Sequence, residues 1–433
     1  MTPRKQHKRG PVLIALALFA GMGAVVVVAS QWRPQAWDLP PDPVEKRLDR
    51  QNNAWFTLAA AADLFATQKA PAISNVTDWI LREPQEFVIA GRVWQQADFQ
   101  PSPVLHTRVR QRADFRPRTA VNERMPTDRA ELVAALRAYI RRLEPALDRL
   151  CEAAGKPWCL DPADPGEAAR TYPKDSGYGS HPGLSVMTAA LINSAVTMSR
   201  EGRGDGKPCE YVRAWLRLTQ FLSPYQDMAY QPAQWSYAAE TLRRADVQRQ
   251  DEMLAWLLEF RTEWKPPVNT FVWFLRLMEH APLSSFRDPG AILSLIRDKR
   301  FLAAHARECL GVVGMTLPEM RKYEIQHPEI RRLRSIAPYY WAQFNSRVLS
   351  GIDGLALMLA IEKYKRERGQ YPDRLEGLVP EYVSRVPMDS FSGKPFVYKK
   401  SADTYALYSN GAGIHPNSLT DVTVFNAWPG YEF

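Results

Sequence analysis

The sequence predicts a mainly α protein with an N-terminal transmembrane helix, an all-helical domain of hairpins, and a small C-terminal α+β module with an antiparallel sheet. Three observations lead to this fold class. An uncharged apolar stretch follows a basic start, apolar residues recur at helical spacing through the middle, and two alternating runs occur near the end. With 433 residues, 45% hydrophobic and 24% charged, the chain is long enough for more than one core.

The first thirty residues have the length and charge pattern of a membrane anchor. Residues 1–10 form a basic arm, and residues 11–30 carry no charged side chain. A helix over this stretch spans about 30 Å, the thickness of the hydrocarbon core of a bilayer. Because positive charge stays on the cytoplasmic side, we expect a single-pass protein of the inner (cytoplasmic) membrane, with residues 11–30 in lipid and the bulk periplasmic or otherwise extracytoplasmic. The alternative is a cleaved signal peptide ending near Ser30, although its apolar region would exceed the usual length of about 7 to 15 residues.

A proline-rich linker, residues 31–44, precedes a predicted helical extracytoplasmic domain, residues 45–335. Short joints that contain glycine or proline separate its predicted helices, and such joints favour antiparallel neighbours. The expected helices lie near residues 129–150, 184–200, 208–222, 233–245, 247–263, 268–280 and 290–310. Four aromatic residues at helical positions are predicted to be core residues: Trp215, Trp235, Tyr237 and Trp256.

The four cysteines are an even number in a chain that we expect in an oxidising compartment. Cys151 and Cys159 flank a segment in which Gly155 and Pro157 can reverse the chain, which predicts a Cys151–Cys159 disulfide. Cys209 with Cys309 is a weaker pairing, because sequence alone does not give connectivity.

The formal net charge is +9, and arginines are concentrated between residues 106 and 129. Such a cluster is typical of nucleic-acid binding. In an extracytoplasmic compartment, however, phospholipid head groups or anionic wall polymers are the available partners, and the alternation Arg108-Val109-Arg110 also fits the solvated face of a strand. We therefore expect no nucleic-acid partner.

A C-terminal module is predicted over residues 338–433. A helix with a basic last turn ends at Gly369, and the runs "KPFVYKK" and "TYALYSN" alternate with period two on either side of "SAD". The first of these runs is the end of the stretch "MDSFSGKPFVYKK", residues 388–400. This stretch places Ser390 near Lys394, a pairing that occurs in nucleophilic sites. Gly393 and Pro395 are turn residues, however, and no further base lies nearby in sequence, so we interpret the stretch as a turn that leads into a strand.

This module resembles the globular part of the major pseudopilins of type II secretion systems. The residues that carry the resemblance are Gly369, Tyr371 and Pro372 after the helix, Pro387, Asp389, Gly393 and Pro395 in the loop, and Tyr405, Leu407, Tyr408, Ser409 and Gly411 in the last strand and its loop. The module is also similar to the tail of a group of uncharacterised membrane-anchored proteins of planctomycetes and related bacteria. Unlike a pseudopilin, this chain places about 310 residues between anchor and module and has no glutamate pattern behind a prepilin-peptidase site. The resemblance implies calcium in the final loop, where this chain has Ala412-Gly413 in place of an acidic residue.

The sequence assigns no catalytic, cofactor-binding or metal-binding residue. The loop "EGRGDGKPCEY" has Pro208 where a phosphate-binding loop needs Ser or Thr, and we interpret it as a loop after a helix. We expect a non-catalytic scaffold or interaction protein of the cell envelope or of a secretion-related assembly, with another envelope protein as partner. The alternative is an envelope hydrolase acting on wall polymer or peptide, with a pocket near residues 176–183, where Ser180 lies beside His181.

Overall fold

The structure is a computed structural model. It describes residues 39–40, 42–67, 87–89, 92–94, 129–160, 162, 184–222, 231–266, 268–280, 299–328, 337–409 and 423–426. The predicted basic arm and transmembrane anchor, the arginine cluster between 106 and 129, and the loop 176–183 therefore lie outside the described residues or at their edge.

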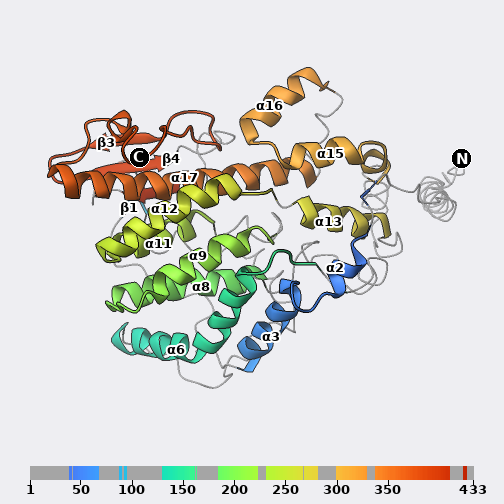
Figure 1. The fold of residues 1–433 in the computed structure, drawn as a ribbon, viewed down its shortest axis with the longest axis horizontal. Coiled ribbons are helices and arrows are strands. Elements are labelled where there is room, and N and C mark those ends of the chain that lie inside the picture. The colour runs from blue at the N-terminus through green and yellow to red at the C-terminus, as the bar shows by residue number, and fades with distance from the viewer. Residues whose placement is uncertain are drawn as a thin grey trace, which may run out of the picture.

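The described part is mostly helical, as predicted (Figure 1). Its helices are α2 (Val44–Leu48), α3 (Ala54–Thr67), α6 (Arg129–Ala154), α8 (Leu184–Arg200), α9 (Lys207–Thr219), α11 (Gln231–Arg244), α12 (Val247–Glu263), α13 (Val268–His280), α15 (Ala306–Val313), α16 (Leu317–Gln326), α17 (Ala337–Arg368) and the 3-10 helix η5 (Leu375–Leu378). Its strands are β1 (Phe87–Ile89), β2 (Arg92–Trp94), β3 (Val397–Lys400), β4 (Tyr405–Ser409) and β5 (Thr423–Asn426).

The helices are stacked on one another from α3 and α6 at one side to α17 at the other (Figure 1). α3 packs on α6, α8 packs on α9 and α11, and α12 packs on α17. One core cluster includes residues from Ala54 in α3 to Phe425 in β5. Residues on both sides of the predicted boundary at 335–338 therefore share one continuous hydrophobic core.

α17 packs on α11, α12, α15 and α16 and also on the strands β4 and β5. Among the described helices it is the one that is long and apolar enough to cross a membrane, over residues 339–368, but 94% of its apolar window is buried inside the protein. Gly351 and Gly354 let the rings of Trp235 and Phe425 approach the backbone of α17 so closely that an added Cβ would overlap both rings. α17 is thus a core helix to which α11 and β5 are fitted through two glycines.

The C-terminal strands form an antiparallel sheet in the order β3-β4-β5. Val397 pairs with Tyr408 and Lys400 with Tyr405, so the two predicted alternating runs form a hairpin, as expected. The third strand, β5, was not predicted; it pairs with β4 through a register shift between Leu407 and Tyr408. Figure 1 shows β3 and β4 along α17, on the side away from α9.

The region 299–326 differs from the single helix predicted near 290–310. Residues 299–304 are helical, the helix is interrupted at His305, and α15 then begins at Ala306. α16 was not predicted; its first turn is closed by a capping box in which Thr316 and Glu319 satisfy each other's backbone N–H groups. Leu317 N donates to Ser346 Oγ at 2.5 Å, which fixes the start of α16 on α17.

The four cysteines are thiols in the structure, so the predicted Cys151–Cys159 disulfide is not formed. Cys151 lies in the last turn of α6, where the charges of Glu210, Asp148 and Lys207 act on it. The segment after α6 is held instead by Asn53, whose side chain accepts from Leu160 N at 3.0 Å and donates to Leu160 O at 2.7 Å. Cys209 and Cys309 belong to separate core clusters, which excludes the second pairing in this fold.

Candidate functional site

The stretch 388–396 folds as a turn around the buried carboxylate of Asp389. Gly393 has φ +73° and donates its N–H to Asp389 O at 2.8 Å, while Asp389 N donates to Lys394 O at 2.9 Å. The side chain of Lys394 is exposed, and its backbone N–H donates to Ser392 Oγ at 3.1 Å. These bonds give the turn its shape.

Asp389 joins three elements of the module. Its Oδ2 accepts from Ser409 Oγ of β4 at 2.7 Å, and its Oδ1 accepts from Phe391 N at 3.0 Å and from the hydroxyl of Ser350 in α17. Phe391 N also donates to Ser350 Oγ at 2.9 Å. A fully buried carboxylate with several donors is strongly stabilised, and here it ties α17, the turn and β4 together.

The other predicted module residues hold the end of α17 and the hairpin. Gly369 has φ +77° and closes the helix by donating its N–H to Lys365 O at 2.8 Å. Lys365 Nζ lies 4.3 Å from the ring centre of Tyr371 and donates to its hydroxyl at 3.1 Å. Pro372 O accepts from Tyr398 Oη at 2.7 Å. Pro395 forms a bridge with Met388, and Tyr408 pairs in β4, whereas Gly411 and the final loop lie outside the described residues.

A second buried carboxylate, Asp353 of α17, lies near this turn. Its Oδ1 accepts from Arg261 Nε of α12 at 2.9 Å, and its Oδ2 is buried with no hydrogen-bond partner among the described residues. Burial, only partly offset by Arg261, raises the pKa of Asp353 to about 6, and the charge of Asp389 acts in the same direction. Asp353 is therefore an ion-pair partner that joins α12 to α17 at an electrostatic cost.

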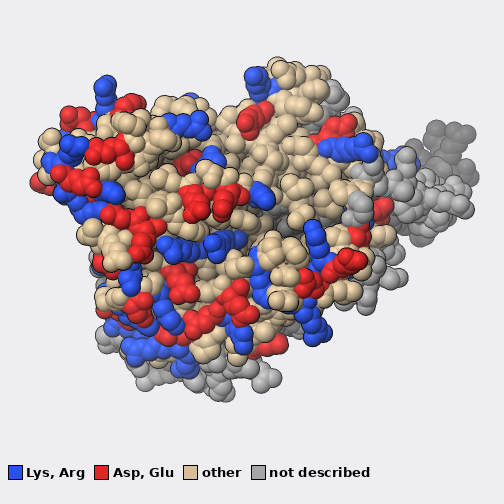
Figure 2. All heavy atoms as spheres, viewed as in Figure 1, with Lys and Arg blue, Asp and Glu red and all other residues tan. Residues whose placement is uncertain are grey.

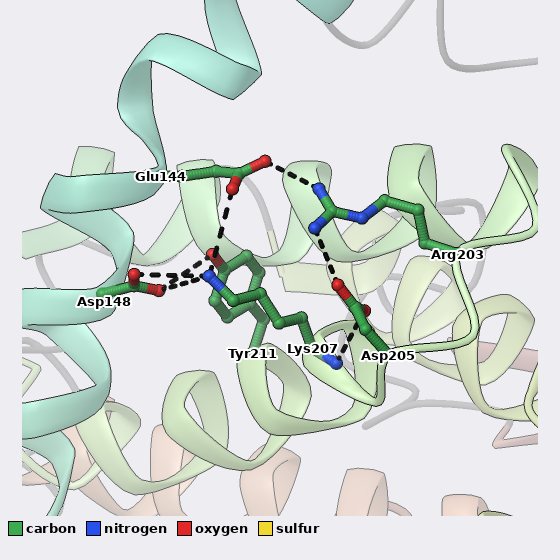
Figure 3. A network of polar contacts seen from close by, with 6 residues as sticks. All are labelled: Glu144, Asp148, Arg203, Asp205, Lys207 and Tyr211. Atoms are coloured by element: carbon green, nitrogen blue, oxygen red, sulfur yellow. Dashed lines mark hydrogen bonds and ion pairs between the residues drawn. The ribbon is translucent and has the colours of Figure 1, made fainter.

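The loop 201–206 between α8 and α9 forms part of a polar network that joins α6, this loop and α9 (Figure 3). Its members are Glu144, Asp148, Arg203, Asp205, Lys207 and Tyr211. Arg203 pairs with Glu144 at 2.6 Å and with Asp205 at 2.7 Å, and Lys207 pairs with Asp148 at 3.1 Å. Both cations are thus occupied by carboxylates of the same network. This loop is a joint between helices, and Gly202 and Gly206 take positive φ where it leaves α8 and enters α9.

The thiol of Cys151 lies beside this network. Burial, with contributions from Glu210 and Asp148, raises its pKa to about 12. A reactive cysteine needs a lowered pKa, so this thiol has the character of a core residue.

His305 and Cys309, which lie four residues apart, do not form a metal site. Cys309 is fully buried in a core cluster with Phe271 and Trp341, and His305 Nδ1 lies 3.9 Å from Glu308 Oε2. In the part of the chain that the structure describes, no group of three His, Cys, Asp or Glu side chains is arranged to hold a metal ion.

The structure also brings together a surface cluster that the sequence analysis did not identify. The guanidinium carbons of Arg213 and Arg217, both on α9, lie 5.7 Å and 5.9 Å from the ring centre of Trp256 on α12. Trp215, Trp235 and Tyr237 are core residues, as predicted, but Trp256 is only half-buried. The four-residue spacing of the two arginines is visible in the sequence; the position of Trp256 beside them depends on tertiary packing.

Comparisons with protein families, with curated proteins and with solved structures gave no match to this chain.

Proposed function

We propose that this chain is a membrane-anchored extracytoplasmic protein that acts as a non-catalytic scaffold or interaction protein of the cell envelope or of a secretion-related assembly. The anchor is residues 11–30, which would hold the protein in the inner membrane. The helical part and the C-terminal module together would form the extracytoplasmic platform that binds another envelope protein.

The observation that carries this proposal is that buried and half-buried polar side chains connect separate elements of secondary structure. Asp389 accepts hydrogen bonds from three elements of the module, Asp353 pairs with Arg261 between α12 and α17, and Arg203 links α6 to the loop before α9. Each of these side chains joins elements of secondary structure. Such cross-links favour a stiff platform, which lowers the entropy lost when a partner binds.

The resemblance of the module to pseudopilins also supports an interaction role, because that family acts by assembly with other proteins. Here the module shares its core with the helical part through α17, so we propose that both parts form one platform and that the chain does not polymerise into a pilus.

The location is tested with alkaline phosphatase, which is active only outside the cytoplasm, fused after Phe433. We expect activity in cells that carry the full chain and none when residues 11–30 are deleted. Activity of a cytosolic reporter fused at the same position would contradict the proposed topology.

The scaffold role is tested separately by crosslinking in intact membranes and by incubating the detergent-solubilised full chain with purified cell-wall polymer. We expect a specific crosslinked protein and no release of soluble wall fragments. Release of fragments at a rate proportional to protein concentration would favour the hydrolase instead.

A further inference from the structure

We propose that Arg213, Arg217 and Trp256, here called the arginine–tryptophan cluster, bind an acidic segment of a partner protein. This inference rests on the proposed function, because it identifies the kind of partner that the scaffold would hold.

The cluster fixes two guanidinium groups on one aromatic platform. Arg213 and Arg217 are four residues apart on α9, so they lie on the same face, about 6 Å apart at their Cβ atoms. Both guanidiniums lie within about 6 Å of the Trp256 ring centre, the range of cation–π interactions. Arg213 is further held by donating Nε–H to Met253 Sδ at 3.1 Å. The ring of Trp256 is itself held by stacking on Phe260, with ring centres 4.7 Å apart.

The charges of these two arginines are unmatched, in contrast to those of their neighbours. Arg200 pairs with Glu240 at 2.6 Å, Arg249 with Asp246 at 3.2 Å and Arg366 with Asp251 at 2.5 Å. No described residue forms an ion pair with Arg213 or Arg217. Arg217 is exposed and Arg213 half-buried, so the N–H groups that point away from the ring are available to a ligand.

Carboxylates are the ligands that fit this arrangement. A guanidinium presents paired N–H donors that match the two oxygens of a carboxylate, and a guanidinium held on a ring loses less rotational freedom on binding. Two carboxylates about one helical turn apart, as in an Asp or Glu pair at i and i+4, would match the spacing of Arg213 and Arg217.

The surroundings favour a local acidic segment over an extended polyanion. Glu210, Glu252 and Glu259 are exposed and lie within one helical turn of members of the cluster. Figure 2 shows a short row of Lys and Arg atoms in the middle of this face, over α9 and α12, with Asp and Glu atoms above and below it. A lipid surface or a nucleic acid of uniform negative charge would meet these carboxylates as well, whereas a protein segment can place its acidic residues on the arginines alone.

The test measures binding of a fluorescein-labelled helical peptide with Glu at i and i+4 to the detergent-solubilised full chain by fluorescence anisotropy. A peptide with Gln at both positions is the matched probe. The variants are Arg213→Gln with Arg217→Gln, Trp256→Ala, and, as a control, Arg149→Gln, which removes an exposed arginine paired with Glu152 on α6. Circular dichroism confirms that each variant is folded.

We expect the Glu peptide to bind more tightly than the Gln peptide, and the double arginine variant to lose at least about tenfold in affinity, since a charge-assisted hydrogen bond contributes about 1.5 to 3 kcal/mol and 1.4 kcal/mol is tenfold. Trp256→Ala should also weaken binding with both arginines present, because the guanidiniums are no longer held. Arg149→Gln should leave binding unchanged.

Equal binding of the two peptides, or equal binding of the Glu peptide by the full chain and by the double variant, would overturn the proposal. It would also be overturned if anionic phosphatidylglycerol vesicles or polyphosphate, and not the peptide, bound in a manner dependent on the two arginines. A phosphatase fusion that is inactive while the Glu peptide still binds would refute the proposed location and leave this inference standing. An active fusion with no peptide binding would refute this inference alone.

Discussion

The indole of Trp235 lies directly against the backbone of Gly351, at the point where any other residue would place its Cβ. Trp235 is fully buried in α11, and Gly351 is in the interior of α17. The contact therefore sets the distance between two helices of the main core.

Replacing Gly351 with alanine should destabilise the protein. The large ring cannot move within a packed core, so the added methyl group should cost about 1 to 3 kcal/mol in the free energy of unfolding, measured by chemical denaturation. Gly311→Ala in α15 is the matched control, because nothing lies within 4 Å of its Cβ position. That variant should be as stable as the parent or up to about 1 kcal/mol more stable, owing to the higher helix propensity of alanine. Equal unfolding midpoints for the two variants would contradict the packing described here.

Replacing Asp389 with alanine should release the module from α17. The change removes the carboxylate that accepts from the hydroxyls of Ser350 and Ser409, and it removes one of the two acceptors of the Phe391 N–H, so we expect a loss of about 3 kcal/mol in the free energy of unfolding. Limited proteolysis should then cleave first near the turn 388–396. Asp389→Asn keeps the side-chain volume and one acceptor oxygen, so this variant should lose less of the free energy of unfolding than the alanine variant.

The matched control for Asp389 is Asp373→Asn, which removes a carboxylate paired with Lys400 at the surface. Because such surface pairs contribute little, its unfolding curve should superimpose on that of the parent. The role of Asp389 would be refuted by an alanine variant as stable as this control.

Asp353 should make stability depend on pH. Its folded pKa of about 6 lies above the ordinary value of 3.8, so the folded protein holds this proton more tightly than the unfolded chain. The stabilisation linked to this proton is complete below about pH 4 and is lost as the pH rises through 6. A difference of about 2 between the folded and unfolded pKa values corresponds to a change of about 3 kcal/mol in the free energy of unfolding.

The measurement compares the free energies of unfolding of the parent and of Asp353→Asn from pH 4 to pH 7. Relative to the parent, the variant should gain about 3 kcal/mol over this range, because its side chain does not ionise. The attraction of Arg261 for the ionised carboxylate is already contained in the pKa of Asp353, so it adds no separate pH dependence. Parallel curves for the two proteins would show that burial does not raise the pKa of Asp353.

The cysteines should react as three buried thiols and one half-buried thiol, Cys151. Burial raises the pKa of Cys209 to about 11 and those of Cys151 and Cys309 to about 12. Titration with a thiol reagent at pH 8 should therefore be slow in the folded protein, and denaturation without reductant should expose all four thiols. A count of two reactive thiols in the denatured protein would instead support the Cys151–Cys159 disulfide that the sequence suggests.

Several helices could be predicted closely because their apolar residues recur at helical spacing between clear breaks. The ranges 247–263 and 268–280 agree with α12 and α13. α16 has ten residues and no strong apolar face, and β5 has four residues, so neither carries enough periodicity to be recognised. The shared core around α17 could not be predicted either, because a helix that is apolar nearly all round does not indicate which neighbours cover it.

The site residues likewise divide into those that local sequence predicts and those that depend on tertiary contacts. The turn at Gly393 and Pro395 follows from backbone chemistry that is local to the sequence. The hydrogen bonds to Asp389 come from residues 39 positions before it and 20 positions after it, and Trp256 reaches the two arginines from a different helix. Such contacts depend on the whole fold, which local sequence patterns do not give.

The burial of α17 has a consequence for the export that we propose for this chain. If the protein crosses the membrane unfolded, a helix as apolar as many spanning segments must pass the translocon without being released into lipid. Asp353 lies in the middle of that helix, and an aspartate at the centre of a membrane segment disfavours insertion by about 2.5 to 3.5 kcal/mol. The residue that is costly in the folded core would therefore help the segment to complete its passage, and the chain would keep a single anchor.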